Sequence, residues 1–149
     1  MKWFSGITNG MLPGFLENQA CMDLLDRVVE GTHGRFDTVD FIDLIRDESI
    51  QLWAAGEDEE VRGIVMSEIT IYPRMKILRL FGLCGSGLSD LIENLPVIKS
   101  WAVAMGCQEI GLEETRAGLE LAVPGFQRSG VCLRMDLTSL GNMETIGAA

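Results

Sequence analysis

Basic residues are scarce in this chain, which has 12 Lys and Arg against 22 Asp and Glu and a formal net charge of −10. Proteins gain much of their affinity for nucleic acids from Lys and Arg contacts to phosphates, so an acidic domain of this kind repels DNA and RNA. The four basic residues from Arg62 to Arg79 form no stripe, because the acidic residues 57–60 lie close to them in the sequence. We therefore expect no nucleic-acid partner.

Histidine and cysteine are too few and too widely spaced for a structural zinc site. The one histidine is His33, in the segment GTHGRF, and the four cysteines are Cys21, Cys84, Cys107 and Cys132. No two of them have metal-ligand spacing, and the cysteine pattern does not suggest a disulfide framework. We expect His33 to lie solvated in a loop, and the cysteines to be small core residues in a reducing compartment.

Long hydrophobic runs are also absent. No stretch approaches the roughly 18 apolar residues of a membrane-spanning helix. Ser5, Thr8 and Asn9 interrupt the apolar residues near the N-terminus, so this segment does not have the pattern of a secretory signal peptide. We expect neither membrane association nor export through a signal peptide. A chain of 149 residues is long enough to bury the core of one domain.

The apolar residues that are present change their spacing along the chain, from helical to strand-like and back. Pro13 suits the first turn of a helix that Gly31 ends, and Asp37 or Thr38 caps the next helix. Pro96 falls inside a later helical pattern and predicts a kink or a restart there. The predicted helices cover residues 13–30, 37–47, 88–105 and 115–123, and the predicted strands cover residues 50–55, 61–72, 76–84, 107–113 and 130–137.

The order of these elements predicts an α/β (α+β) fold built on one mixed sheet with flanking helices. Successive strands joined by short turns imply an antiparallel meander. The strands at 77–84 and 108–113 are joined by a helix, so they pair in parallel if they are neighbours, with a right-handed crossover. The expected domains are an N-terminal arm at residues 1–12, a single domain at residues 13–137 and a C-terminal tail at residues 138–149.

A glycine-rich turn separates the strand at 77–84 from the helix that follows it. Three glycines, Gly82, Gly85 and Gly87, fall within six residues. The backbone amides of residues 85–88 could point one way, since glycine carries no Cβ to obstruct a ligand. The N-terminus of the following helix adds the equivalent of about +0.5 charge. The sequence therefore predicts a phosphate-binding loop.

The element order and several short motifs resemble the GNAT acetyltransferase superfamily. In that family the fourth strand leads into a loop of pattern Arg/Gln-x-x-Gly-x-Gly/Ala, and the segment GLCGSG places Gly85 and Gly87 on its two small positions. The family also has a Gly-Phe pair after the fifth strand and its helix, as Gly125 and Phe126 do here. The chain is most similar to short GNAT-like proteins of tailed bacteriophages. The shared motifs are QLW at 51–53, YPR at 72–74, SWA at 100–102, GC at 106–107 and PGF at 124–126.

The resemblance implies an acetyl-CoA site, with the pyrophosphate on the loop and the pantetheine arm between the two parallel strands. The residues that it assigns to the cofactor are Leu83, Cys84, Gly85, Ser86, Gly87 and Leu88. It also places Glu68 near the family's general base, a role that needs burial to raise the pKa of the carboxyl. Two alternatives stay open: Glu68 is a base or an exposed strand residue, and Ser86 binds phosphate or closes a turn.

Three departures from the family argue against catalysis. Gly82 stands where the family has Arg or Gln, so a donor near the pyrophosphate is lost. Leu121 stands where the family often has a tyrosine that protonates the leaving thiolate, and the one tyrosine of this chain is Tyr72. Asp90 and Glu93, in the first turns of the helix, would repel a nearby pyrophosphate.

Two main functional hypotheses follow from the resemblance. The first is a structural or assembly component of a bacteriophage virion, with a degenerate acetyl-CoA site, present in the host cytoplasm during assembly. The second is an active acetyl-CoA-dependent N-acetyltransferase that acts on an amine, and a cofactor-binding regulator is a third reading. Apolar side chains near both ends, such as Trp3, Phe4 and Ile146, favour the first. They predict arms that dock on other virion proteins or on a second copy of the chain.

Overall fold

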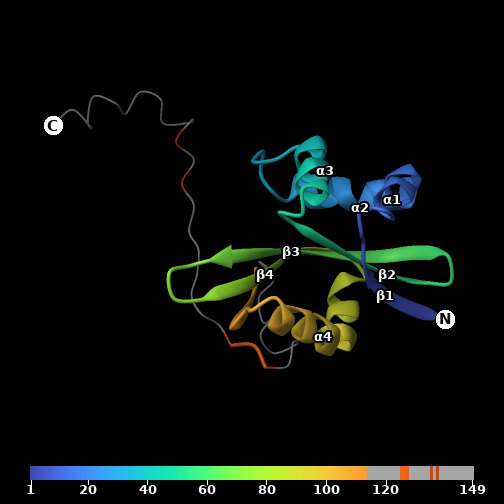
Figure 1. The fold of residues 1–149 in the computed structure, drawn as a ribbon. Coiled ribbons are helices and arrows are strands. Elements are labelled where there is room, and N and C mark those ends of the chain that lie inside the picture. The colour runs from blue at the N-terminus through green and yellow to red at the C-terminus, as the bar shows by residue number, and fades with distance from the viewer. Residues whose placement is uncertain (114–124, 128–134, 136, 138–149) are drawn as a thin grey trace. The chain divides into compact units, whose positions relative to one another are not determined.

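The computed structural model describes residues 1–113, 125–127, 135 and 137, in which the chain forms a five-stranded sheet with helices on both faces (Figure 1). The chain divides into two compact units, Met1–Leu119 and Glu120–Ala149, and all the elements described here belong to the first. The strands are β1 (Lys2–Gly6), β2 (Gln51–Glu57), β3 (Glu60–Ile71), β4 (Lys76–Gly85) and β5 (Glu109–Leu112). The helices are α1 (Leu12–Glu17), α2 (Gln19–Glu30), α3 (Thr38–Arg46) and α4 (Gly87–Ala104).

The strands follow one another across the sheet in the order β1-β2-β3-β4-β5. The first four pair antiparallel, whereas β4 pairs with β5 in parallel, with Ile77 opposite Glu109 and Leu80 opposite Leu112. α4 makes the connection between these two parallel strands. The mixed sheet, its antiparallel meander and the parallel pairing predicted from the sequence are therefore confirmed.

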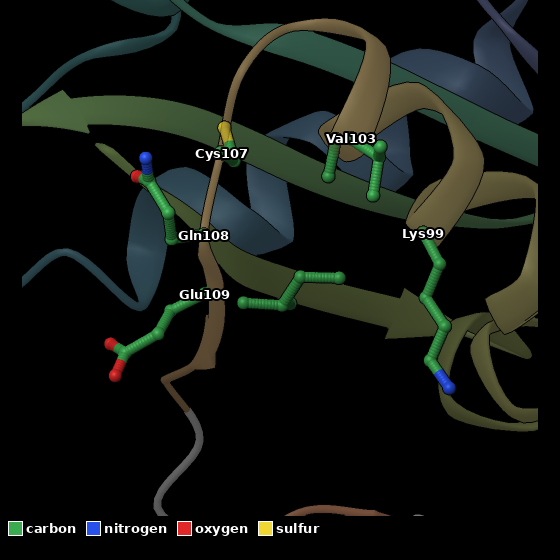
Figure 2. A pocket seen from close by; sticks show the side chains of 7 residues that line it. Lys99, Val103, Cys107, Gln108 and Glu109 are labelled. Atoms are coloured by element: carbon green, nitrogen blue, oxygen red, sulfur yellow. The ribbon is translucent and has the colours of Figure 1, made fainter. Parts of the chain in front are cut away.

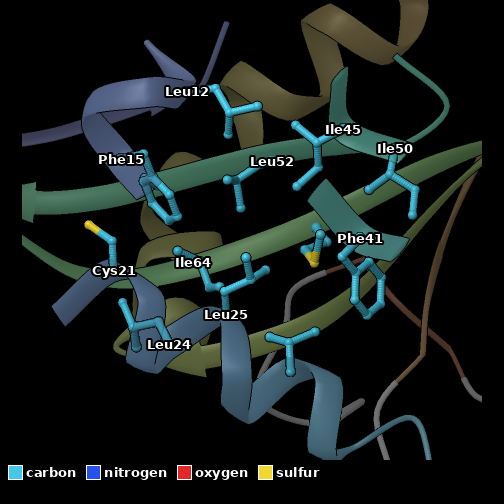
Figure 3. Close-up of a cluster of buried hydrophobic side chains, with 13 residues drawn as sticks. Leu12, Phe15, Cys21, Leu24, Leu25, Phe41, Ile45, Ile50, Leu52 and Ile64 are labelled. Atoms are coloured by element: carbon cyan, nitrogen blue, oxygen red, sulfur yellow. The ribbon is translucent and has the colours of Figure 1, made fainter. Parts of the chain in front are cut away.

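Alternation along β3 sends its side chains into two cores. Ile64 and Met66 point to the face covered by α1, α2 and α3, where they belong to the cluster of buried side chains that includes Phe41 (Figure 3). Val65 points to the opposite face, which α4 covers with buried side chains such as Leu91. The middle of β3 is thus buried on both faces, which explains why its sequence is apolar at successive positions.

Residues 13–30, predicted as one helix, form two. Asn18 has an extended backbone (φ −89°, ψ 120°), and its side chain accepts a hydrogen bond from the backbone N–H of Cys21. Asparagine is favoured at the N-cap of a helix and disfavoured in the interior, because its short side chain competes for backbone hydrogen bonds. α1 therefore ends at Glu17, and α2 begins again at Gln19.

A capping box fixes the start of α3 and resolves the choice between Asp37 and Thr38 in favour of Asp37. The Asp37 carboxylate accepts from the backbone N–H of Asp40 at 2.8 Å. In return, the Asp40 carboxylate accepts from the backbone N–H of Asp37 at 3.0 Å. Two backbone donors at the helix start are satisfied reciprocally.

Replacing Asp37 with alanine should lower the free energy of unfolding by about 1 kcal/mol, because the amide of Asp40 then loses its side-chain acceptor. Urea denaturation measures this difference. Asp43 is an exposed residue of the same helix, and Asp43→Ala should stay within about 0.5 kcal/mol of the unsubstituted protein. Equal losses for the two variants would contradict the capping role of Asp37.

The structure corrects the expectation that residues 1–12 form an arm outside the domain. Lys2–Gly6 is the edge strand β1, paired along its length with β2. The Trp3 indole N–H donates to the carbonyl of Asp58 at 2.8 Å, and the Phe4 ring stacks on Trp53 with centroids 5.7 Å apart. Trp3 and Phe4, two of the apolar side chains that suggested docking on a partner, thus make contacts within the domain.

The remaining predicted elements lie close to their expected bounds. Two acidic residues, Asp58 and Glu59, form the turn between β2 and β3, and Asp58 has a positive φ of 54°. α4 passes through Pro96 as one helix, so the chain does not restart there. Gly125 lies in a turn with φ 83°, as the PGF motif suggests, whereas the helix at 115–123 and the strand at 130–137 fall outside the described residues. Among the described helices, none is long and apolar enough to cross a membrane.

Candidate functional site

The parallel strands β4 and β5 separate part-way along β4. Their register ends with Leu80 opposite Leu112, and one more backbone bond follows, from the N–H of Glu113 to the carbonyl of Leu80 at 2.8 Å. β4 itself continues to Gly85. Within the described part of the chain, the outer edge of residues 81–85 therefore has no strand beside it. An open strand edge offers backbone donors and acceptors to an extended ligand.

A β-bulge lies at the start of this open edge. Ile64 of β3 is opposite Cys84, whereas Met66 is opposite Phe81, so β4 carries an extra residue between them. Gly82 lies in the bulge with φ 64°, and a Cβ there would come within 2.9 Å of Val28 in α2. Gly82 is therefore part of the strand and packs on α2. This explains in structural terms why no Arg or Gln stands at this position.

The turn between β4 and α4 is shorter than the sequence suggested, because Ser86 alone connects them. Gly85 has φ 63°, and a Cβ there would lie 2.2 Å from the carbonyl oxygen of Arg62. A Cβ on Gly87 would lie 2.5 Å from the carbonyl oxygen of Ile64. Both glycines are required because the turn packs directly on the backbone of β3, whether or not a ligand approaches it.

Ser86 uses its polar groups inside the protein. Its backbone N–H donates to the carbonyl of Arg62 at 3.1 Å, and its hydroxyl donates to the carboxylate of Asp90 at 2.6 Å. No side chain caps the N-terminus of α4, since the hydroxyl of Ser86 turns to Asp90 instead. Of the two roles considered for Ser86, the geometry fits the residue that closes a turn.

A small hollow of about 140 Å³ lies beside the N-terminus of α4. Its charged lining contains three carboxylates, from Glu57, Asp90 and Glu93, against the two cations of Lys2 and Arg62. Both cations already have acidic partners: Arg62 lies 3.0 Å from Glu57, and Lys2 lies 3.9 Å from Glu93. The hollow therefore has an excess of negative charge and disfavours an anion.

Glu68 lies on the face of the sheet that α1, α2 and α3 share, directly opposite Arg79. The Arg79 guanidinium donates to the carboxylates of Glu68, at 3.4 Å, and of Glu113. Burial by itself lowers the pKa of Arg79, but the carboxylates of Glu113 and Glu68 outweigh it and raise that pKa above its ordinary value. The Glu68 side chain is 40% exposed. It fits an ion-paired strand residue better than a buried base.

A larger hollow, of about 220 Å³, lies between the last turns of α4 and the start of β5 (Figure 2). Its walls include Val103 and Cys107, and burial raises the pKa of the Cys107 thiol although nearby Lys76 lowers it. None of the residues predicted to bind a cofactor lines this hollow. His33, the one histidine, is exposed in the loop after α2. Within the described residues, no group of three His, Cys, Asp or Glu side chains could hold a metal ion.

The chain was compared with protein-family models, curated proteins and solved structures. No protein-family model matches the chain, and no curated protein matches its sequence. Solved structures do match, among them a glucosamine-6-phosphate N-acetyltransferase from Arabidopsis thaliana, with a TM-score of 0.65, 11% identity, and coverage of 91% of this chain and 98% of that one. An aminoglycoside acetyltransferase from an uncultured soil metagenomic sample, solved with sisomicin, has a TM-score of 0.62, 14% identity, and coverage of 91% and 96%. A predicted acetyltransferase from Clostridium acetobutylicum, solved with acetyl-CoA, has a TM-score of 0.62, 14% identity, and coverage of 93% and 98%.

The fold is the GNAT fold. At these identities the likeness shows the fold alone. Within this GNAT fold, residues 83–88 run together from the open edge of β4 through the turn into α4, while Glu68 lies on β3 in the ion pair with Arg79. Sequence reasoning missed Arg79 as a residue of this region. The available signal was its position in β4 between Leu78 and Leu80, two fully buried residues, where a charged side chain requires a partner.

Proposed function

We propose that the chain is a GNAT-fold protein with a degenerate acetyl-CoA site, which acts as a structural or assembly component. The observation that carries this proposal is the turn between β4 and α4. Its one connecting residue, Ser86, donates its N–H to Arg62 and its hydroxyl to Asp90. These two donors of Ser86 are therefore used within the protein and do not face a phosphate.

The residues fit one part of acetyl-CoA and not the other. The pantetheine arm is an extended chain of amides, and the open edge of β4 at residues 81–85 has the backbone groups to pair with it. The pyrophosphate is a dianion that needs free donors and positive charge. The hollow at the N-terminus of α4 instead contains Glu57, Asp90 and Glu93. The site as a whole therefore does not fit the cofactor, and we derive no transfer step from it.

The residues at the positions of the family's general base and general acid also argue for a weak or inactive enzyme. Glu68 is ion-paired with Arg79 on a half-exposed surface, so its carboxylate already has a partner within the protein. Tyr72 lies in the turn between β3 and β4 and is 49% exposed. Leu121, at the position of the family's acid, lies outside the described residues.

The assembly role itself draws on the sequence resemblance to GNAT-like proteins of tailed bacteriophages. Partners in this proposal are other virion or assembly proteins, or a second copy of the chain. Lys2–Gly6 is paired with β2, so the proposal does not rely on the N-terminal residues as a docking arm. Self-association through a terminal arm then rests on residues 138–149, which lie outside the described part of the chain.

The purified protein should show no acetyl transfer above the uncatalysed rate to peptides, polyamines or aminoglycosides, and its dissociation constant for acetyl-CoA should be above about 0.1 mM. A thiol-release assay measures the transfer rate, and calorimetry measures the dissociation constant. Asp90→Asn should tighten binding by about two- to fivefold, because it removes a carboxylate next to the N-terminus of α4. Asp43→Asn, on exposed α3, is the matched control and should change nothing. Micromolar binding together with turnover would overturn the proposal.

An active N-acetyltransferase acting on an amine is the second candidate, and one observation favours it. Among the described residues, the bulge at Gly82 and the separation of β4 from β5 leave an extended edge of β4 without a neighbouring strand. A strand edge that served no ligand would more often be paired or covered. The calorimetric experiment separates the two candidates, since this one requires micromolar affinity in the unsubstituted protein.

A further inference from the structure

We propose that Arg79 is a positioning residue that fixes the point at which β5 leaves β4, through its bond to Glu113. The functional part of this proposal rests on the degenerate acetyl-CoA site proposed above, because the part of that site that fits the pantetheine arm is the open edge of β4. Its structural part concerns the two strands alone. Each part has its own measurement.

Arg79 lies in the last paired stretch of β4. It is opposite Gly111, and the pairing ends one position later, with Leu80 opposite Leu112. Glu113 is the next residue of β5, and its N–H makes the last described backbone bond between the two strands, to Leu80. The guanidinium of Arg79 donates to the carboxylate of this same Glu113. Main chain and side chain therefore hold one residue, at the point of separation.

The local sequence makes this contact geometrically feasible. Gly111 places no side chain opposite Arg79, and even a Cβ at that position would meet only Ile77, at 3.9 Å. The guanidinium can therefore extend along the surface of β5 as far as Glu113. On its other side Arg79 donates to Glu68 of β3. One side chain thus links β3, β4 and the end of β5.

The charges around Arg79 also favour a fixed position for its guanidinium and for Glu113. Arg79 has two carboxylate partners, and the side chains of Arg79 and Glu113 are 36% and 56% exposed. A planar guanidinium can satisfy two carboxylates at once, whereas lysine presents a single point charge. Fixing Glu113 before a ligand arrives reduces the ordering that binding would otherwise require. Without Arg79, the end of β5 would lose this side-chain contact and keep the backbone bond to Leu80.

Amide exchange of the full-length ¹⁵N-labelled chain, followed by NMR, tests the structural part. In Arg79→Met the N–H of Glu113 should exchange about fivefold faster. This is the largest change in exchange rate expected from the loss of one partly exposed ion pair. Arg79→Lys should restore part of the protection. Glu113→Ala should give the same acceleration, and the double variant should add nothing further, as expected for two residues that act through one contact.

Glu68→Gln is the control, because it leaves the bond between Arg79 and Glu113 in place, and it should not change exchange at Glu113. Unchanged exchange at Glu113 in Arg79→Met would overturn the proposal. So would an equal acceleration at Leu52 of β2, a strand that does not pair with β4, because it would report a general loss of stability.

Acetyl-CoA titration of the same variants tests the functional part. Arg79→Met should weaken binding about threefold relative to the unsubstituted protein, while Glu68→Gln should not. Equal affinities for Arg79→Met and the unsubstituted protein would overturn the link to the ligand. If the unsubstituted protein binds no acetyl-CoA at millimolar concentration, the open edge of β4 does not hold the pantetheine arm either, and the degenerate site proposed above still stands. The exchange measurement then decides the role of Arg79 by itself.

Discussion

Gly85→Ala should lower the free energy of unfolding by about 3 kcal/mol. Two costs combine at this position. The backbone of Gly85 has φ 63°, and the added Cβ would lie 2.2 Å from the carbonyl oxygen of Arg62. That oxygen belongs to β3 and also accepts the N–H of Ser86. Relief of the clash must therefore disturb the turn itself, and urea denaturation followed by circular dichroism measures the loss.

Gly34→Ala is the matched control. Gly34 also has a positive φ, 82°, but a Cβ there would meet nothing within 4 Å. Its substitution therefore costs only the backbone strain, about 1 kcal/mol. If the two variants lost equal stability, the close packing of the turn on β3 would not be what requires glycine at position 85. A phosphate site would then be the better explanation of the glycine.

Phe41→Ala should lower the free energy of unfolding by about 3–5 kcal/mol. Phe41 is 1% exposed and is one of two buried residues of α3. Its ring lies between those of Phe36, with centroids 5.0 Å apart, and Phe81 of β4, at 6.4 Å. Removal of the ring leaves a cavity between α3 and the sheet, so α3 loses its main anchor. Thermal and urea unfolding measure the effect.

Val39→Ala separates the loss of this anchor from a change in helix propensity. Val39 belongs to the same helix and is 62% exposed. Alanine is a better helix former than valine, so this variant should be unchanged or slightly more stable, within about 0.5 kcal/mol. A loss near that of Phe41→Ala would show that α3 is fragile at every position, and would contradict the special role of the aromatic ring.

Most of the sheet could be predicted from the sequence, because β2, β3 and β4 have apolar segments separated by clear turns. The parallel pairing of β4 and β5 followed from the helix between them, since parallel neighbours need a long crossover connection, usually a helix. β1 could not be predicted, because Lys2–Gly6 is a short edge strand whose partner lies far along the chain. The break at Asn18 was missed because the apolar spacing continues across it from Leu16 to Ala20.

The loop at residues 83–88 could be singled out from the sequence, but the structural reason for its glycines could not. The glycines at 85 and 87 were found, but the reason for them is a contact with Arg62 and Ile64, two residues of another strand. Spacing along a chain does not reveal such contacts. The bulge at Gly82 likewise depends on the register with β3, which periodicity alone leaves open.

During synthesis β1 is made well before β2, the strand with which it pairs. Gly6 and Gln51 are about 45 positions apart, and α1, α2 and α3 lie between them. At a synthesis rate of about 5–20 residues per second, β1 waits roughly 2–9 seconds before its partner β2 exists. During that time Trp3 and Phe4 and the apolar faces of three helices have no sheet to cover them. From β2 onward, each new strand pairs with the one made just before it. The residues that precede β2 are therefore made before the strands that cover their apolar side chains, and a chaperone that binds apolar surface would protect them during that time.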